Sequence, residues 1–103
     1  MAQTHHLVKA SHVGNKIVCD PTITMAAVGE TIQWHSFEGA ISVSFSPTPF
    51  SDSRPAWDAD QGLLTDPAPV GGPTATPGKF FPASVLLGGA RLATDGGVII
   101  RGG

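Results

Sequence analysis

Hydrophobic and polar side chains alternate along short segments of this sequence, which is the pattern of β-strands covered on one side. In AISVSFS, Ile41, Val43 and Phe45 fall on one face and serines fall on the other. Ile32 shares a face with Trp34 in the same way. We therefore expect strands that pack one face against a core. The segments with strand patterns are HHLVKA (5–10), KIVC (16–19), TITMAA (22–27), ETIQWHS (30–36), AISVSFS (40–46), KFFPASVLL (79–87), ARLAT (90–94) and VIIR (98–101).

Helical patterns are nearly absent from the sequence. No long window free of proline and glycine repeats its apolar residues with the period of an amphipathic helix. Glycine-rich turns at 88–89 and 95–97 separate the last strands, as is usual in hairpins. The sequence thus predicts an all-β sandwich of about seven or eight strands. We expect one domain that spans residues 1–103.

Residues 47–78 interrupt the alternation and contain most of the chain's nine prolines. We expect a long Pro/Gly-rich loop here, because no clear strand pattern is present. Loops of this length in compact domains are usually functional or disordered. The first half of the loop carries the large apolar side chains Phe50, Trp57, Leu63 and Leu64.

Charge is sparse, since charged residues make up 14% of the chain against roughly 25% in average soluble domains. The six Lys and Arg residues are scattered and the net charge is −2, which argues against a nucleic-acid partner. No run approaches the ~20 apolar residues of a membrane span. The start lacks the basic and apolar segments of a secretion signal. The sequence leaves open whether the chain stays in the cytoplasm or is exported with its leader removed.

Three motifs resemble the cupredoxin fold of plastocyanin and azurin. VGETIQW (28–34) resembles that family's pG(D/E)tv.W strand. TPGKFF (76–81) resembles the returning pGty.y strand, and DGGVIIRGG (95–103) resembles the closing G.i.V strand. The likeness covers roughly residues 17–101. It implies a cupredoxin-like Greek-key β-sandwich.

Copper-free bacterial cupredoxin-like domains are a closer likeness. Their sPF and DP.iiv motifs resemble TPF (48–50) and DGGVII (95–100) in this chain. A blue-copper centre requires two histidines, a cysteine thiolate and usually an axial methionine. The resemblance places the first histidine near Ile41 or Ser42 and the other ligands in or after residues 79–94, and the sequence has none of them there. We therefore expect no copper and no other cofactor.

Cys19 and Met25 belong to early segments of the chain, far in sequence from the positions of copper ligands. A single cysteine cannot form an internal disulfide. We interpret Cys19 as a buried core thiol.

The four histidines, His5, His6, His12 and His35, are the remaining candidate metal ligands. His5 and His6 would point to opposite faces of a strand. A site would therefore need His6, His12 and His35 to be brought together by the first hairpin. We interpret the histidines as surface imidazoles and keep a weak metal site as the alternative.

DADQG (58–62), with Asp52 and Asp66 nearby, faintly resembles a calcium loop. Gly62 and Pro69 occupy places in that loop that require oxygen ligands, so we expect a solvated acidic loop. No serine lies in a GxSxG elbow, and the loop acids form no recognisable acid–base pair. We do not expect an enzyme.

Two functions remain open. In the first, the domain is a binding or structural module that contacts another protein or copies of itself through Phe50, Trp57, Leu63 and Leu64. These four side chains could instead fold back as a lid over the sandwich end. Sheet edges give a second route to assembly, because KIVC and AISVSFS carry one Lys between them and a bare edge could pair with another copy. The second function is a small metal-carrying or ligand-binding domain that uses the N-terminal histidines. We take the first as the expected function.

Overall fold

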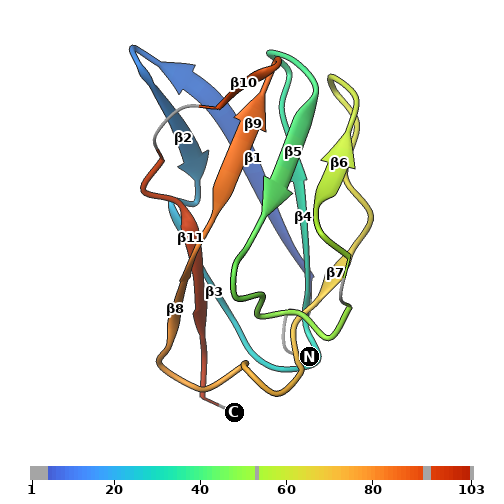
Figure 1. Cartoon of the computed structure of the whole chain (residues 1–103), viewed down its shortest axis with the longest axis vertical. Helices are drawn as coiled ribbons and strands as arrows, with labels where there is room; N and C mark the ends of the chain where they lie inside the picture. Colours follow the sequence, from blue (N-terminus) through green and yellow to red (C-terminus); the bar gives the residue numbers. More distant parts are fainter. Residues whose placement is uncertain (1–4, 53, 92–93, 103) are drawn as a thin grey trace.

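The computed structural model of the chain describes residues 5–52, 54–91 and 94–102, and every helix or strand element among them is a β-strand (Figure 1). The all-β prediction is confirmed. Within the described residues, no helix could span a membrane. The strands are β1 (His5–Val13), β2 (Lys16–Asp20), β3 (Ile23–Ala26), β4 (Thr31–His35), β5 (Ile41–Ser44), β6 (Trp57–Ala59), β7 (Ala68–Pro69), β8 (Phe80–Pro82), β9 (Ser84–Leu87), β10 (Ala90–Arg91) and β11 (Gly97–Ile100).

Hydrogen bonds join these strands into three sheets. Their strand orders are β2-β1-β4-β7, β10-β9-β5-β6 and β3-β11-β8. β1 runs parallel to β4 and β3 runs parallel to β11, whereas the other paired strands are antiparallel. Parallel neighbours cannot be joined by a tight turn, so these two pairings bring distant segments together. Ile23 of β3, for example, lies opposite Gly97 of β11.

At two places, a strand of one sheet leads almost directly into a strand of another sheet. β2 belongs to the first sheet and leads directly into β3 of the third. The segment expected as one strand, 79–87, is divided at Ala83 into β8 and β9, which lie in different sheets. Pro82 has no N–H for a sheet ladder, and the N–H of Ala83 donates to the carbonyl of Gly96 at 3.0 Å. The division thus lies directly after the proline that ends β8.

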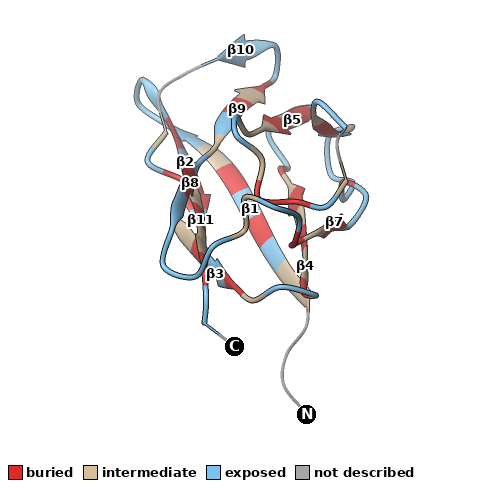
Figure 2. Cartoon of the chain, turned by 60° about the horizontal axis from the view of Figure 1, so that its bottom comes forward, coloured by how far each residue is buried: buried red, intermediate tan, exposed pale blue. Residues whose placement is uncertain are grey.

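The three sheets enclose one hydrophobic core. Ile32 and Trp34 of β4 are buried, as are Ile41 and Val43 of β5, so the faces predicted from the alternation are confirmed. Figure 2 shows the same alternation of buried and exposed residues along β1. Phe45, just beyond β5, packs half-buried against this core.

Residues 47–78 contain strands, contrary to the expectation of a loop without them. β6 pairs with β5, and β7 pairs with β4. Phe50 also forms an isolated bridge with Val70. β6 and β7 are too short to show a clear alternation of apolar and polar residues. β7 moreover contains Pro69, a residue confined to sheet edges, and β7 is an edge strand.

Phe50 lies at the centre of an aromatic cluster. Its ring packs edge-on against Trp34, Phe45 and Trp57, with centroids 5.8, 5.3 and 5.6 Å away. Phe50 is 3% exposed and Trp57 is 2% exposed. The region that the sequence marked as a loop is therefore tied to the core by its aromatic residues.

Arg54 covers the aromatic cluster from outside. Its guanidinium carbon lies 4.1 Å from the ring centroid of Trp57. The same guanidinium donates to Asp52 at 3.3 Å and to Asp66 at 3.2 Å. Cation–π packing and two carboxylate partners thus fasten this segment across Trp57.

One expected sheet edge is not an edge. β5, from the segment AISVSFS, lies between β9 and β6 and has neighbours on both sides. β2, from the segment KIVC, is the outer strand of the first sheet. The error arose because β6, the strand that covers β5, could not be recognised in the sequence.

Replacing Trp57 with Ala should lower the free energy of unfolding by about 3–5 kcal/mol, the usual cost of removing a large buried aromatic side chain. Urea unfolding followed by circular dichroism measures this loss. Phe80→Ala is the matched control, because Phe80 is 43% exposed and should cost much less. Equal losses for the two variants would contradict the interior position of Trp57.

Candidate binding surface

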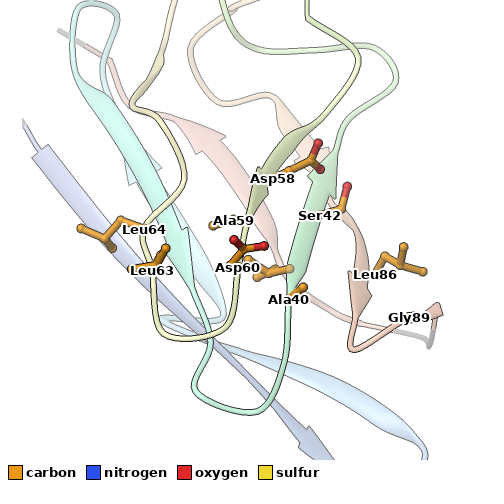
Figure 3. Close-up of a pocket in the computed structure, with 10 residues that line it drawn as sticks. Ala40, Ser42, Asp58, Ala59, Asp60, Leu63, Leu64, Leu86 and Gly89 are labelled. Atoms are coloured by element: carbon orange, nitrogen blue, oxygen red, sulfur yellow. The ribbon is translucent and has the colours of Figure 1, made fainter.

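A shallow groove of about 620 Å³ runs along the sheet that contains β5, β6 and β9 (Figure 3). The strand registers place Asp58, Ser42 and Leu86 in one row across the three strands. The residues on either side of Ser42 and of Leu86 are buried, so these two side chains point away from the core. This row forms the floor of the groove.

The turn that follows β6 forms the side wall of the groove with Asp60, Leu63 and Leu64. Leu63 is 59% exposed and Leu64 is 47% exposed. In the view of Figure 3, the carboxylates of Asp58 and Asp60 stand between these leucines and Leu86. The groove therefore combines apolar flanks with two negative charges.

Backbone hydrogen bonds hold the leucines of the wall in place. The N–H of Gly62 donates to the carbonyl of Ser36 at 2.7 Å, and the N–H of Leu63 donates to that of Asp60 at 3.0 Å. Gly62 has a φ of 81°, a conformation that glycine adopts without strain. The leucines are thus exposed on an ordered turn.

Thr65 fastens the end of this turn to β4. Its N–H donates to the carbonyl of Trp34 at 3.0 Å, and its hydroxyl oxygen accepts from the N–H of Trp34 at 3.1 Å. The side-chain amide of Gln33 donates to the carbonyl of Thr65 at 2.6 Å. Because Thr65 is 1% exposed, these bonds are shielded from water.

The lining of the groove carries negative charge, and Arg91, which pairs with Leu86, lies outside that lining. The lining includes no Lys, Arg or His. Among the described residues, neither Asp58 nor Asp60 takes part in an ion pair. The other acids of the calcium-loop hypothesis, Asp52 and Asp66, are bound to Arg54. The four aspartates therefore do not form one calcium-binding set.

The four side chains proposed as binding anchors divide into two pairs. Leu63 and Leu64 are exposed and line the groove. Phe50 and Trp57 are buried in the aromatic cluster, which corrects their interpretation as exposed anchors and agrees with the fold-back alternative. Their burial is favourable because each ring meets other rings edge-on.

The histidines have separate partners. His6 Nε2 lies 2.6 Å from Glu30 Oε1, and His12 Nδ1 lies 3.1 Å from Glu38 Oε1. His35 packs edge-on against Phe37, with ring centroids 5.4 Å apart. In the described part of the chain, no three His, Cys, Asp or Glu residues are grouped as metal ligands. The hairpin does not bring His6, His12 and His35 together.

The residues at the expected copper position do not fit that metal. β5 places Ile41 in the core and Ser42 in the groove, and neither side chain offers an imidazole. Cys19 is 4% exposed, as the core-thiol interpretation requires. Burial raises the pKa of the Cys19 thiol, and a weak hydrogen bond to Thr94 Oγ1 at 3.8 Å only partly opposes this. Cys19 is therefore a poor source of thiolate.

Glu30 is the centre of a polar cluster where β1, β4 and β11 meet. It is 6% exposed. Its carboxylate contacts His6 at 2.6 Å, accepts from the N–H of Ala27 at 3.2 Å and binds the guanidinium of Arg101. The hydrogen bond from His6 lowers the pKa of Glu30 most strongly, and the Ala27 N–H and the charge of Arg101 act in the same direction against desolvation.

A second apolar surface covers the outer side of the β3-β11-β8 sheet. The registers place Met25, Ile99 and Phe80 in one row across the three strands. Met25 is 54% exposed and Phe80 is 43% exposed. The next row, Ile23, Gly97 and Pro82, is also uncharged. This surface carries no charge that would select a partner, so the groove is the better candidate site.

The sequence did not reveal the floor of the groove. Alternation predicted that Ser42 points outward, but nothing local joins it to Asp58 and Leu86. That row exists because β5 pairs with β6 on one side and with β9 on the other. The segment SVLL offers one local signal of this floor, a leucine that alternation turns outward.

Comparison with protein-family models, with curated proteins and with solved structures found no significant match. The groove and the residues that line it are therefore the features from which a function can be inferred.

Glu30→Gln should destabilise the protein at neutral pH and have a smaller effect in acid. Folding lowers the pKa of Glu30, so its carboxylate stabilises the fold above the unfolded-state pKa, and this contribution is lost as the pH falls through the folded-state pKa. Urea unfolding of both proteins between about pH 7 and about pH 3 measures the difference. A difference that stays constant over that range would contradict this account.

Native mass spectrometry of protein prepared without a His tag tests the metal alternative. With copper, zinc or calcium offered in turn, we expect no stoichiometric complex, because His6, His12 and His35 have separate partners and Asp52 and Asp66 bind Arg54. One bound copper or zinc ion that is lost in His6→Ala would overturn this expectation.

Proposed function

We propose that this chain is a copper-free, cupredoxin-like β-sandwich that serves as a non-catalytic binding module and contacts another protein through the groove. The positions of the family motifs support the fold. VGETIQW leads into β4, TPGKFF leads into β8, and DGGVII leads into β11. Each motif thus introduces a strand, as the resemblance implies.

The observation that carries the binding function is the exposure of Leu63 and Leu64 on an ordered turn beside two carboxylates. Hydrogen bonds at Gly62 and Thr65 hold this turn on both sides of the leucines. About half of each leucine stays in water in the folded chain, and contact with a partner would remove that surface from water. Ordered side chains also lose less entropy on binding than mobile ones.

The composition of the groove supports binding rather than catalysis. Ser42 supplies the one hydroxyl among the described residues that line it. The base that activates a serine nucleophile is most often an imidazole or an amine, and neither group lines this groove. Asp58 and Asp60 thus supply charge for recognition.

Site-specific photo-crosslinking tests the proposed function. A benzophenone amino acid replaces Leu63 in one sample and Val13 in the other, because both side chains are 59% exposed and Val13 lies at the end of β1, outside the groove lining. Each protein is irradiated in an extract of its source cells. We expect position 63 to crosslink to one defined polypeptide and position 13 to give no such product.

Competition with unlabelled protein makes the result specific. Excess wild-type chain should suppress the crosslink from position 63, whereas excess Leu64→Asp variant should suppress it much less. Equal suppression by the two competitors, or the same product from position 13, would contradict binding through the groove.

A further inference from the structure

The charge pattern of the groove defines what kind of segment can occupy it. Asp58 lies in β6 and Asp60 follows two residues later, so their side chains are spaced roughly 7 Å apart along the chain. Both line the groove together with Leu63, Leu64 and Leu86. A matching occupant must therefore present a cation between apolar groups.

A metal ion alone would match this site poorly. Calcium takes six to eight oxygen ligands. Within the described residues, no three acidic, histidine or cysteine side chains are grouped for an ion. A bare cation would also leave Leu63 and Leu64 in water. The pairing of charge with apolar surface favours a side chain of Lys or Arg with apolar neighbours.

An extended peptide has the required geometry. Side chains at alternate positions of a strand share one face and lie roughly 7 Å apart. In a segment of the form Leu-x-Lys-x-Leu, the ammonium group therefore falls between two leucines on the same face. This spacing matches carboxylates that stand between Leu86 and the pair Leu63 and Leu64.

We propose that the groove binds an extended segment of a partner protein in which a Lys or Arg is flanked at alternate positions by large apolar side chains. This inference rests on the proposed binding function and names the partner's chemistry. Charge complementarity supplies the selection, since the lining contains two carboxylates and no cation.

Neither Lys9 nor Arg101 supplies this segment to a second copy. Lys9 follows Leu7 by two residues, but Ser11 takes the place of the second apolar group. Lys9 also lies over the ring of Phe37 at 5.7 Å. Arg101 follows Ile99 by two residues, but its guanidinium binds Glu30.

Nuclear magnetic resonance titration of the ¹⁵N-labelled chain with three capped peptides tests the inference. The first peptide is Leu-Ser-Lys-Ser-Leu, the second replaces Lys with Glu, and the third replaces both leucines with Ser. We expect the first peptide to shift the amide signals of Ser42, Asp58 and Leu86, and to bind at least about 5-fold more tightly than either of the others. Added salt should weaken the binding of the first peptide.

Two double variants with equal loss of charge complete the test. Asp58→Asn with Asp60→Asn should weaken the first peptide about 5-fold or more, because two charge contacts are removed. Asp20→Asn with Asp95→Asn removes the same charge outside the groove and should leave the affinity unchanged. Equal binding of the Lys and Glu peptides, or equal affinities of the two double variants, would overturn the inference.

The failure of this inference can be separated from failure of the proposed function. Loss of peptide selectivity, with the competed crosslink from position 63 intact, would mean that the groove binds a partner of different chemistry. Self-association that is abolished by Asp58→Asn with Asp60→Asn would identify a second copy as the occupant and would also overturn the inference. Sedimentation velocity on the free protein measures that outcome.

Discussion

The burial of Trp57 is the constraint on which the candidate site depends. Its indole lies in the core against Phe50 and beneath Arg54. An aromatic side chain that removes roughly 150–250 Å² from water contributes up to about 4–6 kcal/mol at about 25 cal/mol per Å². With Trp57 inward, the alternation of β6 turns Asp58 outward, and β6 aligns beside β5. This orientation places Asp58 in the floor of the groove.

Hydrogen bonds and ion pairs then hold the segments around the aromatic cluster in place. Thr65 exchanges two hydrogen bonds with the backbone of Trp34, which anchors the far end of the turn that carries the exposed leucines. Glu30 acts in a similar way at the other end of β4, where it joins His6 and Arg101. Among the described residues, no buried side-chain nitrogen or oxygen lacks a hydrogen-bond partner. The core is therefore held by apolar contacts and by polar links at its margins.

Local patterns in the sequence were sufficient to predict single strands but not to predict which strands pair with one another. Ile41 and Val43 were assigned to the core because alternation is visible within a few residues. β6 was not predicted because its three residues are too few to show an alternation of apolar and polar side chains. Its strand conformation comes from pairing with β5. Composition alone did not decide whether Phe50 and Trp57 were anchors or core. The groove required the register of three strands, which no single segment contains.

The parallel pairing of β3 with β11 has a consequence for synthesis on the ribosome. Met25 pairs with Ile99, so the third sheet cannot close until the last strand has emerged from the exit tunnel. Until then the chain holds β3 without its neighbour, and the nascent protein exposes an unpaired, uncharged strand. The third sheet is thus completed only after β11 has been synthesised.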